Sequence, residues 1–238
     1  MHRQTITSAR LDIVGAWPHD AVSWLESQLP SARPAGFDRW APSRRAEFAL
    51  GRKASHEALI RAGAPATELV HSLQATPDRR PLWPLGWTGS ISHSVDPASG
   101  ARVLEAIVAP TSKAIGLGID WESLSRMQTA PALWNRVSDP EERIVLCSHL
   151  DSEEVQAAVI FSAKESLFKA LYPQVLRYQG FEAARLIEAS NNQGKIHLQF
   201  ALTRAWGSRW PAGHLLSAMA EVLENRWVRS EVVILANQ

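Results

Sequence analysis

Two acidic side chains follow a short apolar run and could bind a metal ion. The run Gly116–Glu122 reads as a strand, in which side chains alternate between two faces. Asp120 and Glu122 therefore share one face, about 7 Å apart along the strand. Gly116 and Gly118 lie on that same face and would let a ligand approach the backbone. Paired carboxylates suit a hard cation such as Mg²⁺, whereas the alternative is a solvated strand end without a ligand.

A second set of polar side chains follows on a predicted helix. Glu165 has an aromatic ring about one turn away on each side, Phe161 and Phe168. A carboxylate held between rings is partly desolvated and favours a cation or a proton. Lys169 lies one turn beyond Glu165 and could hold a phosphate, or the two could form an ordinary surface pair. The polar stripe of this helix comprises Ser162, Glu165, Ser166 and Lys169.

Three arginines on another predicted helix could bind phosphate groups. Arg45 and Arg52 are seven residues apart and so share a face, with Arg44 close to it. Guanidinium is planar and permanently charged, which suits phosphate recognition. A solvated helix face explains the same pattern equally well.

The composition is that of an ordinary globular protein. The chain has 238 residues, of which 45% are hydrophobic and 21% charged, and its net charge of +1 gives no indication of nucleic-acid binding. Cys147 is the single cysteine, which excludes an intrachain disulfide and fits a reducing compartment. Residues 1–5 lack the apolar core of a signal peptide, and no apolar run is long enough to span a membrane. We therefore expect a cytoplasmic protein without a membrane partner.

The remaining pattern predicts a chain of mixed helices and strands. Helices are predicted over 46–62 with Ser43 as the N-cap, from 139 onward, and over 152–171 with an end before Pro173. Strands are predicted over 11–17, 89–93, 102–109, 114–122, around 186, and over 196–202, 215–222 and 227–235, with a hairpin turn at 224–225.

The acidic strand and the Glu165 helix together resemble a known family. Gly118-Ile119-Asp120, followed by Phe161-Ser-Ala-Lys-Glu-Ser-Leu-Phe-Lys169, resembles the signature of the 4′-phosphopantetheinyl transferases. The helix motif from Arg44 to Leu59 is similar to that of the surfactin-type group, in the branch that contains enterobactin synthase component D. Arg79-Arg80-Pro81 and the stretch Gly89–Ser94 match two further elements of that branch.

The resemblance implies an α+β fold of two similar α/β halves, related by a pseudo-twofold axis, with the active site at their interface. It implies that residues 1–110 contact coenzyme A and that residues 111–238 carry the metal site and the carrier-protein contact. The coenzyme A contacts that it implies are Arg44, Arg52, Arg80, Ser92, His93 and Lys169.

The reaction implied is transfer of the 4′-phosphopantetheine arm of coenzyme A to a serine of an apo acyl or peptidyl carrier protein, giving holo-carrier protein and 3′,5′-ADP. This is the activity of a holo-[acyl-carrier-protein] synthase, with Mg²⁺ as cofactor. The resemblance assigns Asp120, Glu122 and Glu165 as metal ligands. Glu165 is also the candidate base, directly or through a water, and Lys164 and Lys169 are expected to stabilise phosphate charge.

Two other classes of protein fit the same residues. One is a non-catalytic module that binds coenzyme A or a nucleotide, and the other is a metal-dependent phosphodiesterase that uses the three acids. The transferase interpretation further predicts a monomer in nonribosomal peptide, siderophore or fatty-acid synthesis. It also predicts an apolar carrier contact within residues 124–134, formed by Met127 and Trp134 and rimmed by arginine.

Overall fold

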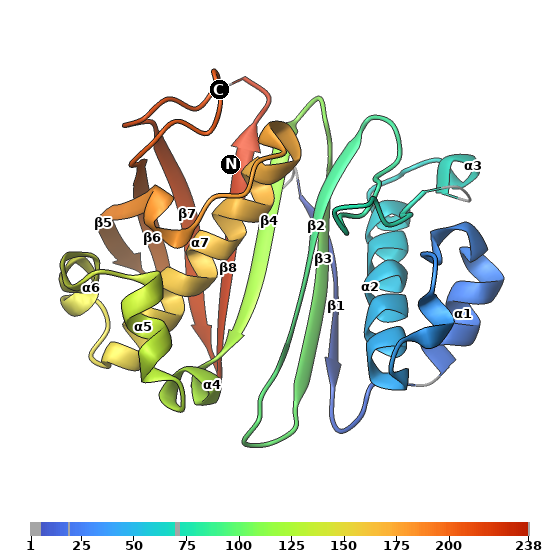
Figure 1. Cartoon of the computed structure of the whole chain (residues 1–238), viewed down its shortest axis with the longest axis horizontal. Helices are drawn as coiled ribbons and strands as arrows, with labels where there is room; N and C mark the ends of the chain where they lie inside the picture. Colours follow the sequence, from blue (N-terminus) through green and yellow to red (C-terminus); the bar gives the residue numbers. More distant parts are fainter. Residues whose placement is uncertain (1–5, 19, 70–71, 238) are drawn as a thin grey trace. The chain divides into compact units, whose positions relative to one another are not determined.

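The computed structural model of the chain describes residues 6–18, 20–69 and 72–237 (Figure 1). Residues 1–5, where the sequence predicts no signal peptide, lie outside the described residues. The chain divides into two compact units. The first comprises Met1–His93, Gly100–Ile115 and Leu235–Gln238, and the second comprises Ser94–Ser99 and Gly116–Ile234. Each unit combines helices with a β-sheet, which confirms the predicted α+β class.

The first unit is built on a three-stranded sheet in the order β1-β3-β2. Its strands are β1 (Thr7–Ile13), β2 (Trp87–Val95) and β3 (Arg102–Pro110). Helix α2 (Pro42–Arg61) packs against β1 and β3, and α1 (Asp20–Gln28) packs against α2 (Figure 1). The short elements of this unit are η2 (Pro30–Ala32), η3 (Phe37–Arg39) and α3 (Ala66–Leu69).

Helix α2 begins four residues before the predicted range, and its N-cap lies two residues before the predicted one. Its first residue is Pro42, and its N-cap Ala41 makes no side-chain hydrogen bond, so the predicted Ser43 cap is wrong. Proline suits the first helical position because its missing N–H would have no partner there. The helix ends before Gly63, whose φ of +87° is the left-handed conformation that glycine adopts easily.

Strand β1 is displaced toward the N-terminus relative to the prediction. It pairs antiparallel with β3 from Thr7, opposite Val108, to Ile13, opposite Arg102, so the predicted strand over 11–17 is only partly correct. Beyond Ile13 the chain bends through Gly15, and Trp17 is buried outside the sheet. Trp17, which the sequence predicts as the end of the strand, is therefore a core residue of the loop that follows β1.

The second unit contains a five-stranded sheet in the order β4-β8-β7-β6-β5. Its strands are β4 (Ala114–Ser123), β5 (Ala184–Asn192), β6 (Lys195–Leu202), β7 (Leu215–Leu223) and β8 (Trp227–Leu235), which confirms the predicted strands. The 224–225 turn is also confirmed, with positive φ at Glu224 and Asn225. Within the described residues, no helix has both the length and the apolar character needed to cross a bilayer.

Helix α7 (Glu153–Val175) packs on this sheet, and shorter helices contact it (Figure 1). The shorter elements are α4 (Leu124–Gln128), α5 (Pro131–Val137), α6 (Pro140–Cys147) and η4 (Phe181–Ala183). Helix α7 continues past Pro173, contrary to the prediction, because a proline in the last turn removes only one helical hydrogen bond. It ends at Leu176, which has a positive φ of 50°.

Two serines of the predicted polar stripe fasten α7 to the sheet. The hydroxyls of Ser162 and Ser166 are fully buried and each lies 2.8 Å from the hydroxyl of Ser230 on β8. Ser166 also donates to the carbonyl of Ser230 at 3.1 Å. These hydroxyls therefore satisfy one another in the core, and only Glu165 and Lys169 of the stripe remain for a site.

Candidate functional site

An ion pair between α7 and β4 brings two of the predicted site residues together. The Nζ of Lys169 lies 2.7 Å from Asp120 Oδ1 and donates to the carbonyl of Ile119 at 2.9 Å. The Asp120 side chain is largely buried, whereas that of Lys169 is partly exposed. The ion pair and the hydrogen bond to the Ile119 carbonyl therefore define the spacing between Asp120 on the strand and Lys169 on the helix.

The glycines of β4 have a different role from the one the sequence indicates. A Cβ added at Gly118 would lie 1.7 Å from the carbonyl oxygen of Ser166, and one at Gly116 would lie 2.4 Å from that of Ala170. Both carbonyls belong to α7. The missing side chains therefore admit the helix backbone rather than a ligand, and the expectation of an open glycine face is wrong.

Glu122 is the most deeply buried acid of the predicted metal set. Its side chain is 2% exposed and accepts hydrogen bonds from the Ser123 amide and from Arg126 Nη1, each at 3.0 Å. Burial raises the pKa of Glu122 to about 7, and the charge of Asp120 adds to this, whereas Arg126 opposes it. Burial is thus the main cause of the shift, and repulsion between the two carboxylates of β4 is a smaller one.

Glu165 is the third acid and comes from α7. Burial raises its pKa, the charge of Asp120 raises it further, and Lys169 and Arg126 oppose the shift. Among the described residues, no side chain or backbone group forms a hydrogen bond or ion pair with its carboxylate. Asp120 thus acts electrostatically on both Glu122 and Glu165, so the three acids form one charge cluster, which we call the acid cluster.

The acid cluster has the oxygen donors that a hard divalent cation prefers. Three carboxylates face only two cationic side chains, Lys169 and Arg126, and burial makes their mutual repulsion costly. A cation would relieve that repulsion, so the residues fit the predicted metal. The three carboxylates are not yet arranged as a set of metal ligands. Within the described part of the chain, no three acidic, histidine or cysteine side chains gather in a metal-binding arrangement.

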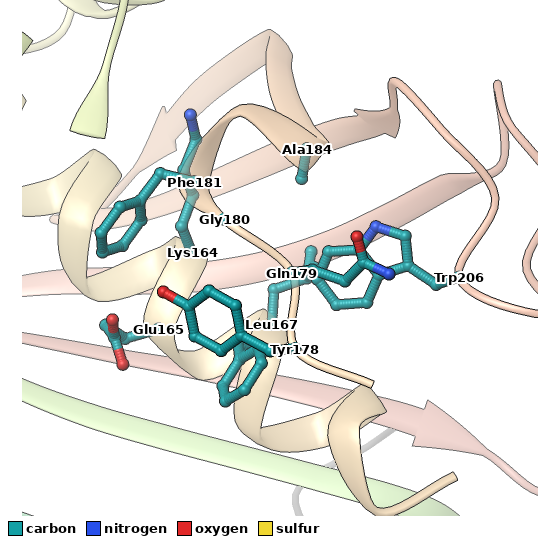
Figure 2. Close-up of a pocket in the computed structure, with 10 residues that line it drawn as sticks. Lys164, Glu165, Leu167, Tyr178, Gln179, Gly180, Phe181, Ala184 and Trp206 are labelled. Carbon is teal, nitrogen blue, oxygen red and sulfur yellow. The ribbon is translucent and has the colours of Figure 1, made fainter. Parts of the chain in front are cut away.

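Lys164 differs from the expectation of a phosphate-binding lysine. Its side chain is 4% exposed, and its ammonium lies 2.7 Å from Glu142 Oε1 and donates to the carbonyl of Val137 at 2.9 Å. Glu142 also closes a capping box with Asp139 and accepts from the Leu186 amide at 2.8 Å. Figure 2 shows the ammonium directed away from Glu165. Lys164 therefore joins α5, α6 and α7 in the core.

A pocket of about 110 Å³ opens beside Glu165 within the second unit. Its walls come from α7 and from the segment that follows the helix, and they include Phe168, Tyr178, Phe181 and Trp206. Figure 2 shows Glu165 on one side of the pocket and Gln179 with Trp206 on the other. A pocket with aromatic walls and a carboxylate on one side suits a narrow, mostly uncharged chain.

A different buried acid lies in the loop after β2. Asp96 is 3% exposed and accepts hydrogen bonds from Ser99, Ser123, Ser125 and the Ala98 amide. Burial alone would raise the pKa of Asp96, but these hydrogen bonds outweigh burial and lower it to about 2. Asp96 therefore anchors the end of β4 and the start of α4.

In the first unit, α2 and β2 gather positive charge. Arg44 pairs with Glu47 and lies over the ring of Trp40, while His93 Nε2 lies 3.2 Å from Glu47 Oε1. Burial lowers the pKa of Arg44, and the charge of Arg79 lowers it further. Arg44 and His93 are thus brought together, and we call this group the arginine cluster.

The other predicted coenzyme A contacts are held by specific partners. The guanidinium of Arg52 is buried over the Phe48 ring and donates to the Leu73 carbonyl at 2.7 Å, and its Nη2 is buried without a hydrogen bond. Burial lowers the pKa of Arg52 to about 10, with Arg44 contributing. Arg80 pairs with Asp78 at 2.7 Å, and Ser92 is buried on β2.

The predicted carrier contact is only partly available. Met127 is fully buried, because α4 packs against α7, so its assignment to a surface contact is wrong. Trp134 is half-buried and donates its Nε1–H to the Met127 carbonyl at 3.0 Å. Arg126 and Arg136 on the same segment remain exposed.

Sequence reasoning missed Glu47 and the pocket residues. Glu47 lies three residues after Arg44, which is a helical contact distance, so an ion pair between them could have been predicted. Its contact with His93 depends on the packing of α2 against the sheet and leaves no local signal. The same holds for Gln179 and Trp206, which are 27 residues apart and meet only at the pocket.

Comparisons with known proteins agree with this arrangement. A sequence model of the 4′-phosphopantetheinyl transferase superfamily matches residues 116–224, and a model of the 4′-phosphopantetheinyl transferase N-terminal domain matches residues 34–101. The acid cluster lies within the first of these matches, and the arginine cluster lies within the second. The chain belongs to the 4′-phosphopantetheinyl transferase superfamily.

Individual relatives support the same family. Enterobactin synthase component D of Salmonella typhi is 30% identical over 79% of this chain and 66% of its own length. The 4′-phosphopantetheinyl transferase Svp of Streptomyces mobaraensis is 35% identical over 71% of this chain and 63% of its own. The chain thus spans just under two thirds of these relatives. The solved holo-[acyl-carrier-protein] synthase of Thermotoga maritima aligns over 51% of this chain and 63% of its own, with 22% identity and a TM-score of 0.36.

Proposed function

We propose that this chain transfers the 4′-phosphopantetheine arm of coenzyme A to a serine of an apo acyl or peptidyl carrier protein. The products are the holo-carrier protein and 3′,5′-ADP. The observation that carries the proposal is the acid cluster: Asp120, Glu122 and Glu165 interact electrostatically, and Lys169 is paired to Asp120, in a chain of this superfamily.

Asp120, Glu122 and Glu165 would hold Mg²⁺, the cofactor we propose. When bound, Mg²⁺ would neutralise charge on the pyrophosphate of coenzyme A. Burial, with a smaller contribution from the charge of Asp120, raises the pKa values of Glu122 and Glu165; this supports the role, because a bound cation favours the ionised carboxylates.

Glu165 is suited to receive the proton of the carrier serine. Its pKa is raised by burial, and a base works best when its pKa approaches the working pH. The serine oxygen would attack the phosphorus next to the arm, the bond from that phosphorus to the oxygen of the leaving 3′,5′-ADP would break, and the hydroxyl proton would pass to Glu165. Lys169 would bind phosphate oxygens from its position beside Asp120.

The pocket beside Glu165 would take the arm itself. Its aromatic walls suit a slender, mostly uncharged chain, and its position next to the acids would leave the phosphate end at the acid cluster. In the first unit, Arg44 and His93 would bind phosphate groups of coenzyme A, with Arg52, Arg80 and Ser92 around them.

The carrier protein would contact the segment from Leu124 to Trp134, through Trp134 and the exposed Arg126. The relatives named enterobactin synthase component D favour a carrier of nonribosomal siderophore synthesis. A monomer and a cytoplasmic location remain predictions, which analytical ultracentrifugation and fractionation of the producing cell would test.

The test is mass spectrometry of an apo carrier protein incubated with the chain, coenzyme A and Mg²⁺. A mass gain of one phosphopantetheine arm on the carrier, with release of 3′,5′-ADP, supports the transferase. A binding module would leave both reactants unchanged, and a phosphodiesterase would cleave coenzyme A while leaving the carrier unmodified. The Asp120→Asn variant is the control for trace contaminating transferase.

A further inference from the structure

The pocket beside Glu165 contains one buried amide side chain that the fold itself does not use. Gln179 is 8% exposed and lines the pocket, yet its carboxamide makes no hydrogen bond within the part of the chain that the structure describes. Its polar atoms are not sealed off from solvent, so a ligand group that enters the pocket can pair with them. Across the pocket from Glu165, Gln179 lies on the same side as Trp206 (Figure 2).

Trp206 provides a second, independent indication at the same place. Its indole is 3% exposed and lines the pocket, and its Nε1 is buried without a hydrogen-bond partner. Buried indole N–H groups usually find an acceptor. Two polar groups thus lack partners on one side of a pocket whose other walls, such as Phe168 and Phe181, are aromatic.

The chemistry of these groups selects one kind of ligand group. A carboxamide offers both a donor and an acceptor, and an indole N–H adds a donor. A secondary amide has one N–H and one carbonyl, so it can pair with the carboxamide in both directions. A phosphate would find no positive charge here, since the Lys164 ammonium is already paired with Glu142, and a purely apolar chain would leave the carboxamide unsatisfied.

We propose that Gln179 is a specificity-determining residue that hydrogen-bonds an amide of the phosphopantetheine arm, with Trp206 as an additional donor. This inference rests on the proposed function, because that function supplies the arm with its two amides. Gln179 acts on binding of the arm and has no role in moving the proton or in holding the metal.

The experiment is calorimetric titration of the full chain, in the presence of Mg²⁺, with coenzyme A and separately with 3′,5′-ADP, which lacks the arm. In the Gln179→Leu variant the Kd for coenzyme A should rise about tenfold, because an amide of the arm is buried without a partner. The Kd for 3′,5′-ADP should not change. Leucine has a similar volume and suits the apolar walls, so the variant should fold.

Gln174→Leu is the matched control. Gln174 is exposed near the end of α7, its amide donates to the Ala170 carbonyl at 3.2 Å, and it does not line the pocket. This substitution should leave both Kd values unchanged. A Gln179→Leu variant that binds coenzyme A as tightly as the wild type, or that loses affinity equally for 3′,5′-ADP, would overturn the inference while leaving the transferase proposal intact. A wild-type chain that binds no coenzyme A would overturn both.

A ligand-side test identifies the amide. Coenzyme A analogues in which either amide is replaced by an ester lose the N–H and keep the carbonyl. For one of them, the loss of affinity seen with wild type should be much smaller in Gln179→Leu, because the hydrogen bond is already absent. Equal losses in both proteins for both analogues would contradict the assignment.

Discussion

Asp96 and the acid cluster, both in the second unit, are largely buried acids that differ in how their charge is compensated. Asp96 accepts four hydrogen bonds from its surroundings, and its pKa falls to about 2. Glu122 is exposed to a similarly small extent, but there burial raises the pKa to about 7; Arg126 opposes the rise and the charge of Asp120 adds to it. Burial disfavours charge in both places, and hydrogen bonds outweigh it only at Asp96.

Under the proposed function, this difference distinguishes a structural acid from a metal-binding acid. The Asp96 carboxylate is complete within the protein, and a cation would have little to add. The acid cluster concentrates negative charge that the two nearby basic side chains only partly offset, so binding of a cation lowers its free energy. Depth of burial alone does not separate the two kinds of site.

The largest expected effect comes from removing charge in the acid cluster. Asp120→Asn or Glu165→Gln should lower kcat for carrier modification by about a thousandfold, because a lost ligand leaves pyrophosphate charge uncompensated. The melting temperature should change little or rise, since repulsion is relieved. Asp96→Asn should do the reverse, with a lower melting temperature and nearly normal kcat in the folded protein. Normal turnover by a folded Asp120→Asn variant would contradict the distinction between the acid cluster and the structural acid Asp96.

The two lysines of α7, Lys164 and Lys169, should also differ, one affecting mainly stability and the other mainly kcat. Lys164→Met leaves the buried Glu142 carboxylate without its cation, so the free energy of unfolding should fall by about 3–5 kcal/mol. Lys169→Met removes a partly exposed partner and should cost less stability but more kcat. Chemical denaturation and steady-state kinetics on the same samples measure both. Equal losses of kcat in the two folded variants would restore a phosphate-binding role for Lys164.

Stability should depend on pH with opposite signs at the two acids. Folding raises the pKa of Glu122 from 4.5 to about 7, so its protonated form stabilises the fold below pH 4.5, and this contribution is lost as pH rises toward 7. The loss is about 3 kcal/mol at most. The difference in unfolding free energy between wild type and Glu122→Gln should therefore fall over that range in metal-free buffer, and Mg²⁺ should flatten it.

For Asp96 the pKa is lowered from 3.8 to about 2, so its contribution is present above pH 3.8 and is lost as pH falls toward 2. The same comparison with Asp96→Asn measures it. If the difference in unfolding free energy between wild type and variant fell with rising pH at both positions, the opposite pKa shifts of Asp96 and Glu122 would be contradicted.

The smallest effect is expected in the arginine cluster, where Glu47 lies between Arg44 and His93. Glu47→Gln removes the charge that holds both side chains, so the KM for coenzyme A should rise several-fold with little change in kcat. Glu47→Asp should recover part of the loss. His93→Ala should act in the same direction, and 3′-dephospho-coenzyme A reports whether the 3′-phosphate is the group concerned. A loss confined to kcat would exclude a binding role for this cluster.

The sequence predicted the site best where the chemistry is local to one element. Asp120 on a strand and Glu165 with Lys169 on a helix follow from periodicity, and the motif resemblance placed them in one site. The Lys169–Asp120 ion pair confirms that these two elements lie together. Alternation in β4 placed Asp120 and Glu122 on one face, but every residue from Leu117 to Ser123 is buried, so the strand is covered on both faces and the predicted open face is wrong.

The failures concern partners that are distant in sequence. Lys164 lies 22 residues from Glu142, and Ser166 lies 64 residues from Ser230, so no local pattern could assign their partners. Met127 is apolar in a predicted surface segment, and only the packing of α4 on α7 decides that it is buried. Periodicity gives the face on which a residue lies, whereas the neighbouring element determines what covers that face.

The contact of Gly116 and Gly118 with the carbonyls of α7 has a consequence for how this protein can be re-engineered. The spacing between the strand acid and the helix acid is fixed by main chain against main chain, without any intervening side chain that mutation could enlarge or shrink. Several walls of the pocket, by contrast, come from the segment after α7, among them Tyr178, Gln179 and Phe181. We therefore expect substitutions at residues such as Gln179 to change which ligand the pocket accepts without changing the spacing between Asp120 and Glu165.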